Sequence, residues 1–373
     1  GVRMTLGWLA GCSLFFYGWW NPAYLALLAC SIALNFALGT RLARRVGEPG
    51  NKALLIAGIG VNLAAIAYYK YAGFLVFNLN VAAGTGFDVA QILLPLAISF
   101  FTFQQITYLV DSYAGRTKEY DWLRYCLFVT FFPQLIAGPI VLHAEMMPQF
   151  ARRALAHPRA MDLAVGLTIF SFGLFKKAVL ADGIAPYADS VFAAAEQGEA
   201  LDITRAWGGV LAYTFQLYFD FSGYSDMAIG VARMFGIVLP QNFNSPYKAR
   251  DIIDFWRRWH MTLSRFLRDY VYIPLGDNRR GMLRRHSNLL ATMLLGGLWH
   301  GAGWNFVIWG GLHGAYLMLN HGWGAVSRSR GLPRLGWCGL LLTFASVVVA
   351  WIFFRAPTLQ GALTMLHAMF GGN

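Results

Sequence analysis

The sequence predicts an all-α integral membrane protein that crosses the bilayer many times, and three observations support this. Hydrophobic residues make up 57% of the 373 residues and charged residues only 13%, whereas soluble chains carry about 25% charged residues. Apolar runs close to the roughly 20 residues that cross a bilayer recur along the chain. Basic residues gather in the short stretches between these runs, as in cytoplasmic loops. Since lipid offers backbone groups no hydrogen-bond partner, the segments are expected to be helices.

The distribution of charge orients the first of these segments. Arg41, Arg44, Arg45 and Lys52 place the 40–52 loop in the cytoplasm, and the 78–89 loop, which has no Lys or Arg, lies outside. We expect about nine to eleven membrane segments, some of them half-spans. They are drawn from the apolar runs 4–20, 22–40, 53–77, 90–110, 122–141, 160–181, 205–219, 227–240, 288–303, 304–320 and 336–356.

The segment 122–141 is expected to be broken. It contains FFPQLIAGP, with Pro133 and Pro139 at positions where helix hydrogen bonds would run. A full crossing here would also place Arg152, Arg153 and Arg159 outside the cell. A re-entrant hairpin that enters and leaves on the cytoplasmic side accounts for both facts. Broken backbone at membrane depth is tolerated only where protein buries it or a cavity hydrates it, so this segment indicates a site inside the membrane.

The formal net charge of +12 raises nucleic-acid binding as an alternative. That function needs basic residues on one water-exposed face, and here they lie between apolar runs, so we exclude it. We expect a single membrane domain, 1–373, truncated at both ends. Its sizeable aqueous parts are an acidic 182–204 loop and a basic, amphipathic 241–287 region on the cytoplasmic side. No cluster of His and acidic residues has metal-ligand spacing, so neither a metal nor a bound cofactor is expected.

Residues 251–267, DIIDFWRRWHMTLSRFL, are expected to form one amphipathic helix along the cytoplasmic interface. At about 100° per residue its large apolar side chains share one face. His260 lies at the boundary of that face, where it either points toward the helix bundle or keeps its polar tip in water. Arg257 and Arg258 lie on the opposite face, where they contact either lipid phosphates or the phosphates of an acyl donor such as coenzyme A.

His300 is an ionisable residue in the apolar run 288–314. If a helix starts near Asn288, His300 lies about 18 Å along it, past the middle of a hydrocarbon core about 30 Å thick. An intramembrane histidine is a candidate functional residue, and imidazole suits a general base that removes a hydroxyl proton. The alternative is a core histidine bonded to a neighbouring helix. His313 cannot share a helix face with His300 and is expected to be mainly structural, with substrate binding as the alternative.

The run YFDFSGYSD, residues 218–226, interrupts another apolar stretch with Asp220, Ser222 and Tyr224. An unpaired carboxylate in lipid costs several kcal/mol. These groups therefore either form a structural network or line an aqueous cavity that binds substrate. Lys177, near the outer end of the run 160–181, either snorkels to the interface or forms part of a charged funnel wall.

Five motifs follow one another along the chain: FFPQLIAGPI, DFSGYSDMAIG, NFNSPY, DFWRRWHMTLSRFLRDYVYIPLGDNRRG and LLGGLWHGAGWNFVIWGGLHG. From about Phe16 to Arg355 the sequence closely resembles the bacterial membrane-bound O-acyltransferase (MBOAT) family, in particular its alginate O-acetyltransferase branch. The resemblance implies a helical bundle around a central intramembrane funnel. It also implies that His300, in the Trp-His-Gly motif, is the catalytic histidine and that His260, in Arg-Arg-Trp-His, is a second histidine needed for activity.

On this resemblance, the leading hypothesis is acetyl transfer from a cytoplasmic thioester, acetyl-CoA or an acyl carrier, to hydroxyls of an exported alginate-like polysaccharide at the bacterial inner membrane. His300 deprotonates the acceptor or a relay nucleophile, and Trp299, Asn305 and backbone N–H groups stabilise the oxyanion. Two alternatives stay open. The chain either passes the acetyl group to a periplasmic or secreted acetyltransferase partner, or transfers D-alanine to teichoic acid. Membrane lipid, the acyl donor and the polysaccharide are the other expected partners.

Overall fold

The computed structural model describes residues 1–90, 92–117, 120–136, 138–152, 159–279, 281–331, 333 and 335–372. Within these ranges the chain forms helices and no strands, which confirms the predicted all-α class. The described residues divide into two compact units. Unit 1 comprises residues 1–171 and 226–240, and unit 2 comprises residues 172–225 and 241–373. Arg153, one of the basic residues expected on the cytoplasmic side, lies outside the described residues.

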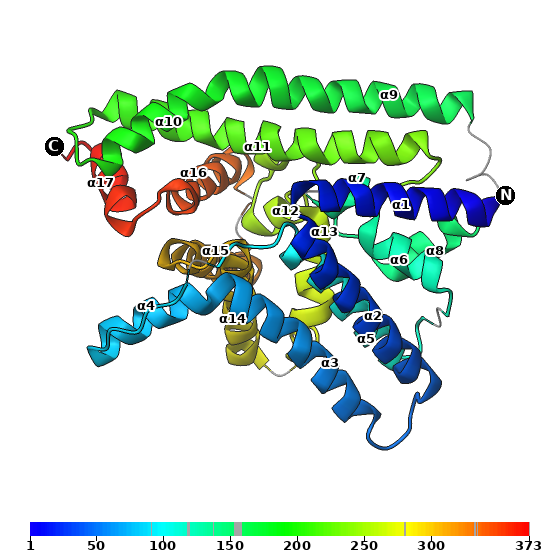
Figure 1. Ribbon diagram of the computed structural model, residues 1–373. Helices are drawn as coiled ribbons and strands as arrows, with labels where there is room; N and C mark the ends of the chain where they lie inside the picture. The colour runs from blue at the N-terminus through cyan, green and yellow to red at the C-terminus, as the bar shows by residue number, and fades with distance from the viewer. Residues whose placement is uncertain are drawn as a thin grey trace. The chain divides into compact units, whose positions relative to one another are not determined.

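Unit 1 is built mainly from the N-terminal helices, of which α2, α3 and α5 contact one another (Figure 1). A buried polar network joins these three helices. The Asn35 side-chain amide donates to Asn62 at 3.2 Å and to Gln105 at 2.5 Å, and interhelical hydrogen bonds of this kind hold helices together in lipid. The unit's elements are α1 (Val2–Trp20), α2 (Pro22–Arg44), α3 (Asn51–Ile66), η1 (Ala67–Tyr71), α4 (Ala72–Ala83), α5 (Ile98–Tyr113), α6 (Trp122–Thr130), α7 (Phe132–Leu135) and α8 (His143–Phe150).

The expected break in the segment 122–141 is present. Helix α6 ends at Thr130, Phe131 adopts an extended ψ of 102°, and α7 begins with Pro133 in its first turn. Residues 136 and 138–142, before α8, have no regular structure. Phe131, Leu135 and Val141 are buried, so protein covers this irregular backbone, as its position requires. The re-entrant path itself stays a prediction.

Unit 2 contains the C-terminal half of the chain. Its core is rich in aromatic residues, and its helices α14 and α15 form an antiparallel hairpin (Figure 1). Its elements are η3 (Lys176–Ala181), α10 (Asp182–Glu196), η4 (Pro246–Lys248), α12 (Ile252–Trp256), α13 (Met261–Leu267), η5 (Arg268–Tyr272), α14 (Gly281–His300), α15 (Trp304–Arg330), α16 (Gly336–Arg355) and α17 (Leu359–Met369). Helices α9 (Ala160–Phe175) and α11 (Ile203–Met234) have residues in both units.

Two expectations about unit 2 and its connections are wrong. The acidic stretch 182–204 is mostly helical, because α10 continues directly from η3 to Glu196. The runs 205–219 and 227–240 are not separate segments, since the single 32-residue helix α11 passes through the polar stretch between them. Two polar residues in the middle of α11, Asp220 and Ser225, have partners on neighbouring elements.

Four helices of the described chain are long and apolar enough to cross a membrane: Pro22–Arg44, Asn51–Ala83, Ala160–Glu196 and Gly336–Arg355. The predicted nine to eleven segments also include shorter half-spans, and their number stays a prediction. The 20 residues of α14 still rise about 30 Å. Large apolar side chains such as Phe77 and Val81 on α4 are more than half exposed, which suits contact with lipid rather than water.

Candidate active site

The hairpin of α14 and α15 positions His300. Its two helices pack backbone against backbone, because a Cβ atom on Gly297 would overlap the Phe306 carbonyl oxygen and one on Gly310 would overlap that of Met293. Such close approach through small residues is typical of helix pairs in membranes. His300 is the last residue of α14, and the turn at 301–303 leads directly into α15. The hairpin therefore fixes the position of the imidazole relative to the first turn of α15.

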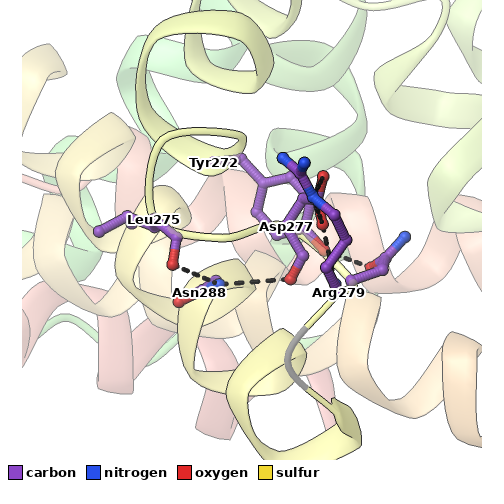
Figure 2. Close-up of polar contacts among 6 residues, drawn as sticks. Tyr272, Leu275, Asp277, Arg279 and Asn288 are labelled. Atoms are coloured by element: carbon purple, nitrogen blue, oxygen red, sulfur yellow. Dashed lines mark hydrogen bonds and ion pairs between the residues drawn. The ribbon is translucent and has the colours of Figure 1, made fainter.

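The loop that precedes α14 is held by Asn288, a buried residue about two turns into that helix (Figure 2). Its side-chain amide donates to the carbonyl oxygens of Leu275 at 3.2 Å and Asp277 at 3.3 Å. Asp277 also pairs with Arg279 at 3.0 Å. Helix α14 consequently begins at Gly281 rather than near Asn288 as expected, so the predicted 18 Å distance of His300 along the helix is an underestimate.

Aromatic rings surround the His300 imidazole. Its ring centroid lies 4.8 Å from Trp299, 5.0 Å from Trp309 and 5.0 Å from Phe354. The side chain is half-buried, so part of the ring stays accessible. An accessible imidazole is a candidate general base.

His313 lies in the same aromatic cluster, although it is on the other helix of the hairpin. Its ring is completely buried, 4.7 Å from Trp309 and 5.1 Å from Trp256. Because Trp309 contacts both His300 and His313, the antiparallel packing brings together two histidines that the linear pattern separates. Neither ring nitrogen of His313 has a hydrogen-bond partner among the described residues.

His260 belongs to this cluster through Trp299, whose ring centroid lies 6.0 Å from it. The expected single helix over 251–267 is wrong. The chain leaves helical geometry after Trp256, and His260 adopts a left-handed conformation with φ of 42° before α13 begins. Such a conformation costs about 1–2 kcal/mol for a non-glycine residue. The predicted apolar face is nevertheless confirmed as buried: Ile252, Phe255, Trp256, Trp259, Leu263, Phe266 and Leu267.

The break turns His260 away from water. Only 1% of the residue is exposed, which decides between the two interpretations in favour of the protein interior. Burial lowers the pKa of His260 well below its usual value, and the neighbouring His300 lowers it further. The imidazole is therefore neutral near pH 7, because burial disfavours its charged form.

Helix α11 presents two faces at the DFSGYSD motif. Asp220 and Tyr224, four residues apart, both face Lys177 of η3: the Lys177 ammonium lies 2.8 Å from the Asp220 carboxylate and 5.7 Å from the Tyr224 ring centroid. Lys177 also pairs with Asp182 at 2.6 Å. Asp220 and Tyr224 thus belong to an ion-paired network rather than to the histidine cluster.

The other face of the same helix contacts His260. Phe221 meets the His260 ring edge-on at a centroid distance of 4.7 Å, and Ser225 is buried and hydrogen-bonded to Asn242 at 3.2 Å. Ser222 is buried as well, and its hydroxyl has no partner among the described residues. The structure therefore divides the residues of this motif between two clusters.

The remaining predicted site residues are dispersed. Arg257 is exposed, whereas Arg258 pairs with Asp254 at 2.9 Å. Asn305, in the first turn of α15, donates one amide N–H to the Ala356 carbonyl oxygen at 2.7 Å, so this hydrogen is engaged in holding the end of α16. Among the described residues, no group of three or more His, Cys, Asp or Glu side chains is placed to hold a metal ion.

Sequence reasoning missed two residues of this region. Trp309 links His300 to His313, and Asn242 contacts both His260 and Ser225. Asn242 lies in NFNSPY, a motif whose place in the chain was recognised but whose side chains were not assigned. Another buried histidine, His143, belongs to unit 1 and lies 2.7 Å from the Thr117 hydroxyl.

A half-buried imidazole in an apolar helical protein is a candidate functional residue of a membrane-bound enzyme. The comparison with protein families makes this specific. The sequence model of the membrane-bound O-acyltransferase family, MBOAT, matches residues 88–358, which include parts of both units. The chain belongs to this family and is an O-acyltransferase.

Several relatives align over most of this chain. It is 45% identical to the peptidoglycan O-acetyltransferase of Helicobacter pylori, over 98% of this chain and 74% of that protein. It is 43% identical to the probable alginate O-acetylase AlgI of Pseudomonas aeruginosa, over 96% of this chain and 68% of that protein. The teichoic acid D-alanyltransferase of Streptococcus thermophilus is 29% identical, over 69% of this chain and 68% of its own length.

Proposed function

We propose that this protein transfers an acetyl group from a cytoplasmic thioester donor to hydroxyls of an extracytoplasmic polysaccharide at the bacterial inner membrane. The names of its relatives support this assignment, since those at 45% and 43% identity act on peptidoglycan and alginate, respectively. Donors of this kind are acetyl-CoA or an acyl carrier. The exposed guanidinium of Arg257 is available for a donor phosphate.

The observation that carries the proposal is the half-buried His300 ring at the carbonyl end of α14. The imidazole accepts the proton of the sugar hydroxyl while the hydroxyl oxygen attacks the thioester carbonyl carbon. The tetrahedral oxyanion then collapses, the carbon–sulfur bond breaks, and the imidazolium returns the proton to the leaving thiolate. The products are an O-acetyl ester and a free thiol, and His300 is regenerated.

The oxyanion needs hydrogen-bond donors, and the start of α15 supplies them. Gly303 precedes the helix and provides no side-chain cap, and the N–H groups at the start of a helix point toward an anion placed there. The positive end of the helix dipole favours negative charge there. Trp299 lies beside the His300 ring, and Asn305 has a second amide hydrogen beyond the one bound to Ala356.

Reconstitution of the purified protein tests this function. With acetyl-CoA as donor and oligosaccharides of alginate or peptidoglycan as acceptors, we expect thiol release matched by O-acetyl groups on one of the glycans, measured by thiol titration and mass spectrometry. If thiol release requires an added periplasmic acetyltransferase, the protein passes the acetyl group to that partner and does not transfer it directly to the glycan. If the protein transfers D-alanine from a charged carrier protein but transfers no acetyl groups, the acetyl assignment is rejected.

A further inference from the structure

Asn242 connects the motifs DFSGYSD, NFNSPY and WRRWH, and the role of this connection goes beyond the proposed reaction. Its side-chain oxygen lies 3.0 Å from His260 Nδ1 and accepts hydrogen bonds from the Thr262 backbone N–H at 3.3 Å and the Thr262 hydroxyl at 2.9 Å. Its amide nitrogen donates to Ser225 Oγ at 3.2 Å. Asn242 is 1% exposed, so these contacts are made away from water.

The backbone keeps Asn242 in this position. The Asn242 carbonyl oxygen accepts the Met261 N–H at 2.9 Å, and the Arg258 carbonyl oxygen accepts the Asn244 N–H at 2.9 Å. The segments 242–244 and 258–261 therefore lie alongside each other. Asn242 thus caps the start of α13 from a distant point in the sequence, and this cap explains why the chain turns at His260 rather than continuing as one helix.

The orientation of the Asn242 amide determines which nitrogen of His260 carries the proton. A backbone N–H can only donate, so the side-chain atom facing the Thr262 N–H must be the oxygen. The same oxygen faces His260 Nδ1. Because an amide oxygen only accepts, Nδ1 must carry a hydrogen, and in the neutral ring Nε2 then has a free lone pair.

The opposite side of the ring carries the nitrogen that Asn242 does not contact. Among the described residues, His260 Nε2 is buried and has no hydrogen-bond partner. The rings next to it, Phe221 and Trp299, are largely apolar, and Trp299 also contacts His300. We propose that Asn242 is a positioning residue that holds His260 as the Nδ1–H tautomer, so that Nε2 accepts a hydrogen bond from a substrate O–H or N–H group.

This inference rests on the proposed function only in naming the acyl-transfer substrate as the group that bonds His260 Nε2. It restricts what His260 can do, because a neutral ring with its proton on Nδ1 cannot donate from Nε2. In the resting protein, His260 is therefore an acceptor that orients a substrate and not an acid that protonates one. The tautomer itself can be measured without any acyl transfer.

Nitrogen NMR of histidine-labelled protein in lipid bilayers provides that measurement, with the His260 signals assigned by their loss in His260→Gln. We expect a protonated Nδ1 and an unprotonated Nε2 in the wild type and in Asn242→Asp, which keeps an oxygen acceptor. Asn242→Ala should lose this preference. Asn244→Ala is the matched control, since Asn244 is exposed and in the same motif, and it should retain the wild-type tautomer.

Acetyl-transfer kinetics of the same variants test the consequence. We expect kcat to fall about 10- to 100-fold in Asn242→Ala, as for other groups that orient a functional histidine, with most activity kept in Asn242→Asp and Asn244→Ala. A proton on Nε2 in the wild type would overturn the inference, as would equal kcat in Asn242→Ala and Asn244→Ala. Should Asn242→Ala not fold, the wild-type and Asn242→Asp spectra still decide. If the wild type shows the expected tautomer but transfers no acetyl group, only the proposed function is refuted and the inference about Asn242 stands.

Discussion

Replacing His300 by alanine is expected to reduce acyl transfer about 100- to 10,000-fold, the range attributed to a positioned general base. The variant removes the one half-buried imidazole of the histidine cluster and leaves the glycine contacts of the hairpin in place. The free energy of unfolding should change little, because the His300 side chain is only half-buried. Initial rates of thiol release by purified protein, with saturating donor, measure the effect.

The matched control for this substitution is His321→Ala, also a half-buried histidine on the hairpin but outside the aromatic cluster. It should keep nearly the wild-type rate. Both variants should elute as single symmetrical peaks in size-exclusion chromatography, which separates loss of chemistry from loss of fold. Substantial activity in a well-folded His300→Ala protein would reject the base.

Replacing Gly310 by valine should cost the protein both stability and activity. The new side chain would overlap the Met293 carbonyl oxygen, and backbone, unlike a flexible side chain, cannot move aside without separating α14 from α15. Overpacking of this kind costs about 1–3 kcal/mol, occasionally more. Because Trp309, its neighbour, links the rings of His300 and His313, separation of the helices would also disturb the site.

Gly311→Val provides the comparison for Gly310→Val. The nearest atom to a Cβ at Gly311 is the Leu294 Cδ2 at 3.8 Å, an ordinary contact. Thermal denaturation followed by size-exclusion chromatography should show a clear loss of stability in Gly310→Val and a smaller change in Gly311→Val. Equal stability of the two variants would show that close backbone packing does not hold the hairpin together.

The fold class was predictable because it depends on composition and on runs of apolar residues, which lie within single segments. The apolar face of 251–267 was predictable for the same reason, since a 3.6-residue period places these side chains together whether or not the helix is continuous. The break near Pro133 was predictable from the missing N–H of proline. Each of these features is local in the sequence.

Features that depend on distant partners were not predictable in this way. The turn at His260 exists because Asn242, eighteen residues earlier, bonds Met261 and Thr262. His313 lies near His300 because glycines let two helices approach closely. Asp220 was recognised as costly in lipid, but its partner Lys177 comes from another element. Sequence periodicity describes one helix at a time, and these contacts join two.

Transfer across a sealed membrane tests the central claim, that one imidazole at position 300 serves a donor and an acceptor on opposite sides. Proteoliposomes with the protein inserted in one orientation would contain labelled acetyl-CoA inside, with a membrane-impermeant oligosaccharide outside. We predict labelled O-acetyl groups on the external oligosaccharide with the wild type and none above background with His300→Ala. Equal labelling by both proteins, or labelling only when donor and acceptor share one compartment, would contradict the account.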